Sequence, residues 1–146
     1  MKLVVDASVA LKWLIDEPDS ELADNLLDGG HDFLAPELIV AEVLNAAWRR
    51  RRLGEIADAQ FEEIVVRIVD GLIAYQPLRP LAPRAAALAR DLNHPVYDCL
   101  YLALAEAEEA PLVTADRRLL AVVQGTALAK RVSRLGRLTE RRSRRR

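Results

Sequence analysis

Short apolar runs alternate along the chain with longer segments of helical periodicity, and this alternation predicts the architecture. The apolar runs at residues 3–5, 32–35, 72–75 and 112–114 are typical of buried strands. Apolar residues at helical spacing predict helices over residues 8–15, 18–28, 36–52, 55–70, 83–92, 95–109 and 117–123. A last strand is expected near residues 129–133. Strands that alternate with helices predict an α/β fold whose central, mostly parallel sheet is flanked by helices.

The composition is that of a soluble globular protein. Hydrophobic residues make up 51% of the 146 positions and charged residues 29%, which suits one domain with a hydrophobic core. We expect this domain to cover residues 1–135, followed by an Arg-rich, disordered tail over residues 136–146. The single cysteine, Cys99, excludes an internal disulfide and fits a reducing compartment such as the cytoplasm.

The chain is not expected to enter a membrane. No apolar run approaches the roughly 18 residues that a membrane helix needs. The apolar first fifteen residues contain Asp6 and Lys12 and are interpreted as a strand and a helix, not as a signal peptide.

Charge is distributed unevenly although the net charge is −1. Residues 1–129 hold 21 acidic and 12 basic side chains, whereas residues 130–146 hold nine basic and one acidic side chain. The basic end could hold a polyanion such as RNA, or it could be a solubilising extension without a binding role.

Four acidic residues each interrupt or end an apolar run, where an unpaired charge is costly. They are Asp6, Glu42, Asp98 and Asp116. Asp6 directly follows the first predicted strand, and Asp116 lies two residues beyond the strand that ends at Thr114. In open parallel sheets, ligands bind at this carboxyl edge of the strands. The alternative for both residues is helix N-capping, for which Asp is favoured.

Glu42 lies in a helix that is expected to be buried nearly all round. Only one narrow polar stripe, made by Glu42, Asn45 and Arg49, interrupts its apolar surface. The alternative reading is a Glu42–Arg49 ion pair. Asp98 stands in the first turn of the helix that Pro95 begins, where an acid also favours the helix dipole.

No base is expected beside Asp98, whose helical neighbours are apolar or aromatic. His94 is interpreted as a turn and capping residue. If the four carboxylates converge at one edge of the sheet, they would repel one another and require a cation. Ligands that are all oxygen favour Mg²⁺ or Mn²⁺, and such ions are used in phosphate chemistry.

Four stretches together resemble the PIN-domain nucleases, and most closely the VapC-type toxins of bacterial toxin–antitoxin pairs. The stretches are VVDASVALKWL, PELIVAEVLNA, HPVYDCLYLALA and LVTADRRL, and the resemblance covers residues 1 to about 124. It implies a three-layer PIN fold, a Mg²⁺- or Mn²⁺-dependent endoribonuclease, a cognate antitoxin and a homodimer. The Arg-rich extension after about Leu135 exceeds the family pattern.

The resemblance assigns the catalytic and metal-binding roles to the same four acids. Asp6, Asp98 and Asp116 would bind metal directly or through water, and Glu42 would hold a second ion or position the attacking water. The resemblance also makes Ser8 and Thr114 supporting hydroxyl groups, and Asn45, one turn from Glu42, a supporting amide.

The surroundings of the acids suggest contacts with RNA and with a protein partner. Arg49 and Arg50 open a run of four arginines that could contact the RNA backbone or simply complement the helix dipole. Apolar positions in residues 8–15 and around Trp48 could line a groove for an antitoxin helix or a dimer face.

Two other functions would also place acids at the edge of the sheet or keep the same fold. One is a degenerate PIN scaffold that binds RNA or protein without catalysis, which four intact acids disfavour. The other is a phosphohydrolase with an aspartyl nucleophile. That chemistry typically has a second Asp two residues after the first, where this chain has Ser8.

Overall fold

The computed structural model describes residues 1–138 and confirms the predicted α/β architecture. The strands are β1 (Lys2–Val5), β2 (Asp32–Pro36), β3 (Ile73–Gln76), β4 (Leu112–Thr114) and β5 (Val132–Arg134). The helices are α1 (Ala7–Leu14), α2 (Ser20–Leu27), α3 (Leu38–Arg52), α4 (Asp58–Val69), α5 (Ala82–Leu92), α6 (Val96–Ala107) and α7 (Arg117–Val123). Two 3₁₀ turns, Arg79–Leu81 and Ala129–Arg131, precede α5 and β5.

The five strands form one sheet in the order β3-β2-β1-β4-β5, and every pair is parallel. The chain builds outward from β1 through β2 to β3, and then crosses to the other side of β1 for β4 and β5. The strand order therefore reverses between β1 and β4. Such a switch point leaves a crevice at the carboxyl ends of the two strands, where α/β proteins bind ligands.

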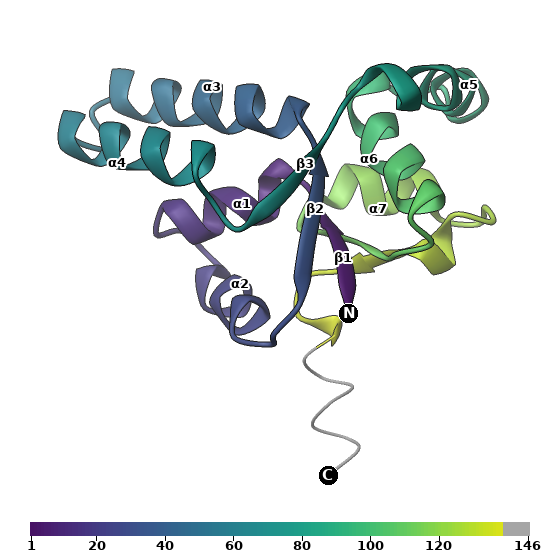
Figure 1. The fold of residues 1–146 in the computed structure, drawn as a ribbon, viewed down its shortest axis with the longest axis horizontal. Helices are drawn as coiled ribbons and strands as arrows, with labels where there is room; N and C mark the ends of the chain where they lie inside the picture. Colours follow the sequence, from purple (N-terminus) through teal and green to yellow (C-terminus); the bar gives the residue numbers. More distant parts are fainter. Residues whose placement is uncertain (139–146) are drawn as a thin grey trace, which may run out of the picture.

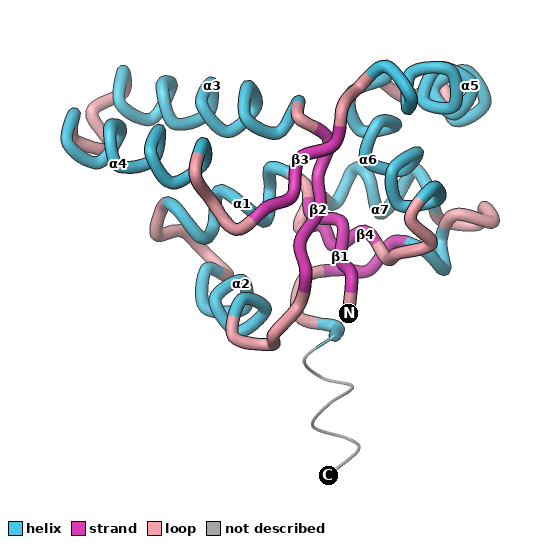
Figure 2. The backbone as a smooth tube through the Cα atoms, viewed as in Figure 1, coloured by secondary structure: helices cyan, strands magenta, loops and turns pink. Residues whose placement is uncertain are grey.

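Helices cover both sides of the sheet and complete three layers. α1 to α4 lie on one side and α5 to α7 on the other, with α3 and α4 projecting as an antiparallel pair (Figures 1 and 2). The core lies between the layers, and residues 3–5 of β1 are fully buried in it. None of the helices within residues 1–138 is long and apolar enough to cross a membrane.

The helix with the longest buried segment is α6, not α3. In α6 seven consecutive residues, 99–105, are buried, as expected for a helix at the centre of the core. In α3 the buried residues Ile39, Val43 and Ala47 form a single face, and Ala41 and Asn45 are exposed. The prediction that α3 is buried nearly all round was therefore wrong, because α3 packs on the rest of the fold through one stripe.

Two predicted boundaries also differ. Pro36 is the last residue of β2 and does not open the helix. It pairs with Gln76 of β3, and the N–H of the next residue, Glu37, donates to the Gln76 carbonyl at 2.9 Å. Successive N–H groups alternate in direction, so the missing N–H of Pro36 would face β1, whose ladder with β2 ends at Leu34. The last strand is Val132–Arg134, because residues 129–131 form a 3₁₀ turn first.

The predicted disordered tail over residues 136–146 falls mainly on residues 139–146, which lie outside the described part of the chain. Residues 135–138, which precede that part, still contact the folded domain. Leu135 is buried and its N–H donates to the Thr114 carbonyl at 2.8 Å, and Leu138 packs against the core.

Candidate functional site

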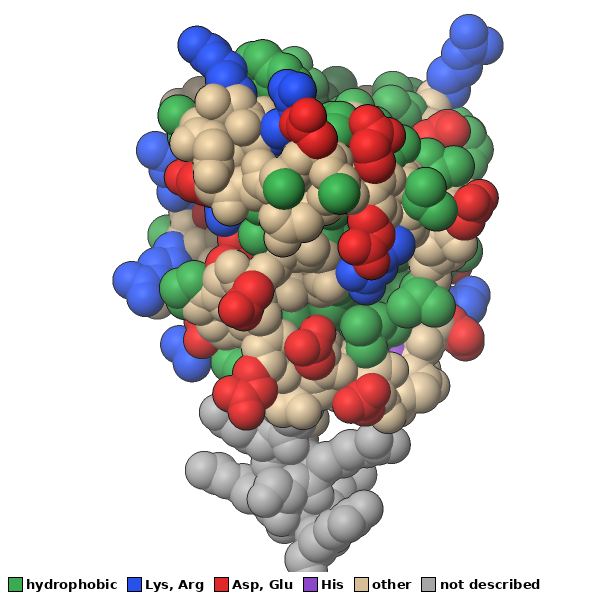
Figure 3. Space-filling model, turned by 90° about the vertical axis from the view of Figure 1, so that its left-hand side faces the viewer, with side chains coloured by type: hydrophobic (Ala, Val, Ile, Leu, Met, Phe, Trp, Pro, Cys, Tyr) green, Lys and Arg blue, Asp and Glu red, His purple; other side chains and the backbone are tan. Residues whose placement is uncertain are grey.

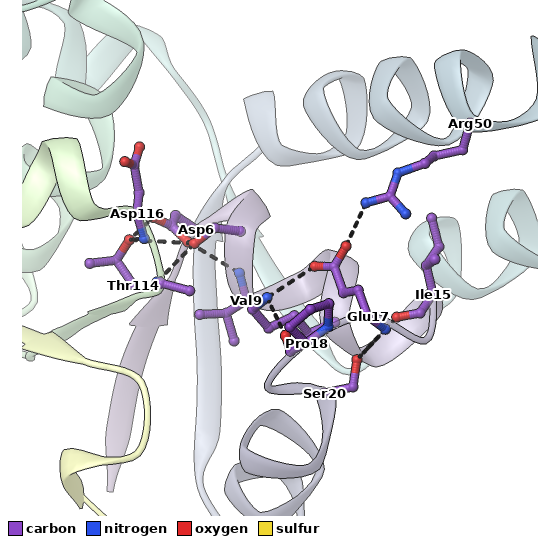
Figure 4. Close-up of polar contacts among 12 residues, drawn as sticks. Asp6, Val9, Ile15, Glu17, Pro18, Ser20, Arg50, Thr114 and Asp116 are labelled. Atoms are coloured by element: carbon purple, nitrogen blue, oxygen red, sulfur yellow. Dashed lines mark hydrogen bonds and ion pairs between the residues drawn. The ribbon is translucent and has the colours of Figure 1, made fainter. Parts of the chain in front are cut away.

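Asp6 lies at the switch point, between the end of β1 and the start of α1. Its side chain is 5% exposed and is held on both oxygens. Oδ1 accepts hydrogen bonds from Ser8 Oγ at 2.5 Å and from Val9 N–H at 3.3 Å, and Oδ2 accepts one from Thr114 Oγ1 (Figure 4). Asp6 therefore caps α1, as the alternative reading predicted, and it is also fixed at the carboxyl edge of the sheet.

Burial raises the pKa of the Asp6 carboxyl to about 6. The hydrogen bonds from Ser8, Thr114 and Val9 oppose this rise because they favour the charged form, and the nearby Asp98 carboxylate adds to it. Asp6 is thus a buried acid whose charge is only partly compensated within the protein.

A chain of hydrogen bonds joins Asp6 to Asp116. Thr114 Oγ1 donates to Asp6 and accepts from the Asp116 N–H at 2.9 Å, and Ser8 Oγ accepts from the Ala115 N–H at 2.9 Å. The Asp116 Oδ1 caps α7 by accepting from the Arg118 N–H at 2.8 Å. The two hydroxyl groups hold the ends of β1 and β4 together. Their predicted role in supporting catalysis stays a prediction.

The Glu42 side chain is bonded to α6 and not to Arg49 near the C-terminal end of its own helix, α3. The buried Tyr101 hydroxyl donates to Glu42 Oε1 at 2.6 Å. Burial raises the pKa of Glu42, the Tyr101 hydrogen bond lowers it, and Asp98 raises it further. Within residues 1–138 no ion pair joins Glu42 to Arg49, and no hydrogen bond joins it to the exposed Asn45.

Asp98 has a basic neighbour, contrary to the prediction. His94, four residues earlier and just before α6 begins, has its Nε2 2.6 Å from Asp98 Oδ2. An ionised carboxylate can only accept, so the imidazole N–H donates in this bond. His94 therefore orients an acid of the candidate site in addition to any role in the turn before Pro95.

Three of the four acids share one electrostatic environment. Asp98 raises the pKa of both Asp6 and Glu42, and all three acids raise the pKa of the Tyr101 phenol after the larger effect of burial. Asp116 is connected to this group through Thr114. Within residues 1–138 no lysine or arginine forms an ion pair with Asp6, Glu42, Asp98 or Asp116.

The donor set fits a hard divalent cation, although the carboxylates do not form a closed cage. Glu42, Asp98 and Asp116 each have one oxygen held by the protein and a second that accepts no hydrogen bond from residues 1–138. In the same residues no three Asp, Glu, His or Cys side chains are grouped closely enough to hold an ion together. Mg²⁺ typically binds through one or two carboxylates and several waters, which such an open arrangement allows.

The PIN-domain family model matches residues 3–124, which is most of the chain. The chain belongs to the PIN-domain family.

Relatives of this PIN domain include two proteins named as ribonucleases. The chain is 31% identical over 121 residues to ribonuclease VapC3 of Pyrobaculum aerophilum, covering 82% of this chain and 92% of the relative. It is 32% identical over 117 residues to ribonuclease VapC12 of Mycobacterium tuberculosis, covering 80% and 88%. Its fold is similar to that of a toxin–antitoxin complex from Klebsiella pneumoniae, with a TM-score of 0.63 and 16% identity over 86% and 95% of the two chains.

Most of the arginine run of this PIN domain is engaged in contacts within the fold. Arg50 pairs with Glu17 at 2.6 Å and with Glu55 at 3.4 Å, which ties α3 to the loops after α1 and α3. Arg51 pairs with Asp58 at 2.5 Å, and the Arg52 guanidinium lies 5.6 Å from the centre of the Trp48 ring. Arg49 is exposed and takes part in no ion pair within residues 1–138, so it is the better candidate for an RNA contact.

Sequence reasoning missed Tyr101 and His94 as partners of the acids. A signal for Tyr101 was present, because a tyrosine within the apolar run of residues 99–105 needs a hydrogen-bond partner when it is buried. Its position three residues after Asp98 places it near the same face of α6. The signal for His94 was its position four residues before Asp98, although Pro95 is extended and the helix begins only at Val96.

Proposed function

We propose that this PIN domain is a Mg²⁺- or Mn²⁺-dependent endoribonuclease that acts as the toxin of a VapBC-type toxin–antitoxin pair. One observation carries the proposal. Asp6 is buried at the switch point of the sheet, the Asp98 carboxylate acts on both Asp6 and Glu42, and no lysine or arginine of residues 1–138 forms an ion pair with the three acids. The two relatives named ribonuclease VapC support the choice of RNA as the substrate.

In this proposal Asp6, Asp98 and Asp116 hold the cation, directly or through water, and Glu42 positions the attacking water or a second ion. A bound cation would lower the pKa of the water that attacks the phosphodiester and would neutralise developing charge. Ser8 and Thr114 keep the Asp6 carboxylate at one position, and His94 leaves Asp98 with one free oxygen. Asn45, one turn from Glu42 on α3 and exposed, keeps its proposed supporting role beside Glu42.

Cleavage of RNA by charge-neutralised variants tests the catalytic proposal. Asp6→Asn and Asp98→Asn should each lower the cleavage rate at least a hundredfold, since each removes a negatively charged ligand at nearly unchanged volume. Asp24→Asn, an exposed position on α2, is the matched control and should cleave at the wild-type rate. EDTA should abolish cleavage and added Mg²⁺ or Mn²⁺ should restore it.

Undiminished cleavage by either folded site variant would contradict the assignment. A chain that binds RNA but neither cleaves it nor binds Mn²⁺ in an Asp6-dependent way would instead be the degenerate scaffold. Hydrolysis of small phosphomonoesters without RNA cleavage would favour the phosphohydrolase.

A second part of the proposal is that an antitoxin segment binds in an apolar cavity beside α1 and α4. This cavity of about 330 Å³ is lined by Trp13, Leu14, Leu27, Val66, Leu72 and Tyr75, among others. Val66 and Leu72 are 60% and 71% exposed, respectively. The toxin–antitoxin complex with a similar fold supports a protein partner. Figure 3 shows the side that carries α1 to α4, where hydrophobic side chains lie among acidic ones, so an amphipathic basic segment would suit it.

Only some of the residues that were predicted to form an apolar groove line this cavity. Trp13 and Leu14 line the cavity, whereas Val9 is fully buried and Trp48 lies under Arg52 on α3. Leu72→Asp should weaken binding of a co-expressed antitoxin, and Leu53→Asp, an equally exposed leucine outside the cavity, should not. Equal binding by both variants would exclude the cavity as the docking site. The homodimer stays a prediction, which light scattering can test.

A further inference from the structure

Tyr101 has the largest fully buried side chain of the fold, with 1% exposure, yet it carries a polar hydroxyl group. That hydroxyl has one partner, Glu42 Oε1 at 2.6 Å. The two residues lie on α6 and α3, which cover opposite sides of the sheet (Figure 1). We infer that Tyr101 is a positioning residue of the acidic site, whose hydroxyl fixes the orientation of Glu42 for the proposed RNA cleavage; this inference rests on the proposed function.

The placement of Tyr101 on α6 supports this role. Asp98 lies three residues earlier on the same helix, so one helix carries both an acid of the site and the hydroxyl that holds a second acid. Burial and the surrounding carboxylates raise the pKa of the phenol, so the hydroxyl stays protonated and serves as the donor. The bond therefore ties Glu42 to the helix that carries Asp98.

Without this hydrogen bond the Glu42 side chain would be free to change its orientation. It is a long side chain of intermediate exposure, and Asp98 disfavours its charged form. In the described residues Glu42 accepts no other hydrogen bond from a side chain. A free Glu42 would turn toward solvent, away from the like charge, and its Oε2 would leave the place where it orients water or a cation.

The distinguishing variant is Tyr101→Phe, which keeps the ring and removes only the hydroxyl. Thr126→Val is the matched control, because it also removes one hydroxyl at similar volume, and the Thr126 hydroxyl donates to the Val123 carbonyl just after the C-terminal end of α7. We expect Tyr101→Phe to lower kcat on RNA and the affinity for Mn²⁺ by on the order of tenfold to a hundredfold, with KM close to wild type. Thr126→Val should leave all three quantities unchanged.

A double-mutant cycle separates positioning from a general effect on the fold. If Tyr101 acts through Glu42, Tyr101→Phe should cause no further loss of Mn²⁺ affinity in a Glu42→Ala background. A merely structural role would produce the same loss in both backgrounds. Calorimetric Mn²⁺ titration gives this readout without RNA, and thermal melts verify that each variant is folded.

Two results would overturn the inference alone: wild-type kcat and Mn²⁺ affinity in folded Tyr101→Phe, or equal losses with and without Glu42. If Glu42→Ala and Asp98→Asn both bind Mn²⁺ and cleave RNA like wild type, the proposed function fails and the role of Tyr101 fails with it. Loss in those two variants together with wild-type behaviour of Tyr101→Phe would leave the proposed function standing and reject the positioning role.

Discussion

Burial of a carboxyl group at Asp6 gives the metal-free protein a defined dependence of stability on pH. The pKa of Asp6 rises from its ordinary 3.8 to about 6 in the folded state, so between these values the folded protein binds this proton more tightly than the unfolded chain. The stabilisation is complete below pH 4 and is lost as the pH rises through 6. By pH 8 the loss amounts to about 3 kcal/mol at most.

Asp6→Asn should therefore be more stable than wild type at pH 8 in EDTA, and the difference should shrink toward pH 4. Denaturant unfolding across this pH range measures it, with Asp24→Asn as the exposed control. Added Mg²⁺ should stabilise the wild type and leave Asp6→Asn unchanged, because a ligand of the folded state shifts unfolding by mass action. Parallel pH curves for wild type and Asp6→Asn would contradict the effect of burial.

At the scale of single residues, the sequence identified the acids but not the groups that hold them. Asp6 and Asp116 could be placed because both follow apolar runs that end at one edge of a parallel sheet. The Tyr101–Glu42 bond depends on how α6 packs against α3, so the sequence signals that Tyr101 needs a partner but not which one. The His94–Asp98 contact, by contrast, is local and was missed because His94 was interpreted as a turn and capping residue. Whether the four acids share a cation is a property of distances, and it stays a prediction.

At the scale of elements, α3 ends in four arginines whose surroundings differ. Arg50 pairs with Glu17, whose side chain is only 13% exposed, whereas Arg49 is exposed without an ion pair in the described chain. Arg50→Ala should lower the free energy of unfolding by about 1 kcal/mol, because it leaves the largely buried Glu17 carboxylate with Lys12 as its remaining basic partner. Arg49→Ala should leave stability unchanged and weaken RNA binding.

Each of the two arginine variants serves as the control for the other. Binding is measured by fluorescence anisotropy in an Asp6→Asn background, so that the RNA stays intact, and stability by urea unfolding. If Arg50→Ala weakens RNA binding as strongly as Arg49→Ala without loss of stability, the assignment of Arg50 to the fold is wrong.

Hydrophobic periodicity predicted which elements form and approximately where they begin and end. It failed for the burial of α3, because alanine is tolerated equally well at buried and exposed helix positions, and Ala41 is exposed while Ala47 is buried. It also misplaced Pro36, since proline fits both the first turn of a helix and the end of a strand.

At the scale of the whole molecule, alternation of strands and helices predicted a parallel sheet, but periodicity alone does not give the strand order. The pairing of β1 with both β2 and β4 depends on contacts between residues far apart in the sequence. This order creates the switch point, so the site exists only because the chain crosses β1 between β3 and β4.

The charge of the whole chain raises the question of how an acidic body would bind an acidic substrate. Residues 1–129 hold 21 acidic and 12 basic side chains, and five of the arginines lie beyond Leu138. Leu135 and Leu138 pack against the core, so removal of residues 139–146 keeps both contacts. A truncation that begins at residue 137 would remove the contact of Leu138. This truncation removes five arginines and Glu140.

We expect the truncated chain to bind RNA more weakly and with a flatter dependence on salt, because fewer counterions are released from the RNA on binding. For single-stranded RNA, the slope of log affinity against log salt should fall by up to about 3.5 if all five arginines contact phosphates. Anisotropy titrations in the Asp6→Asn background at several salt concentrations measure this slope. A full-length variant with the five arginines replaced by glutamine should reproduce the truncation. An unchanged slope in both would mean that the basic end does not hold the substrate, and that exposed arginines of the folded body such as Arg49 bind it instead.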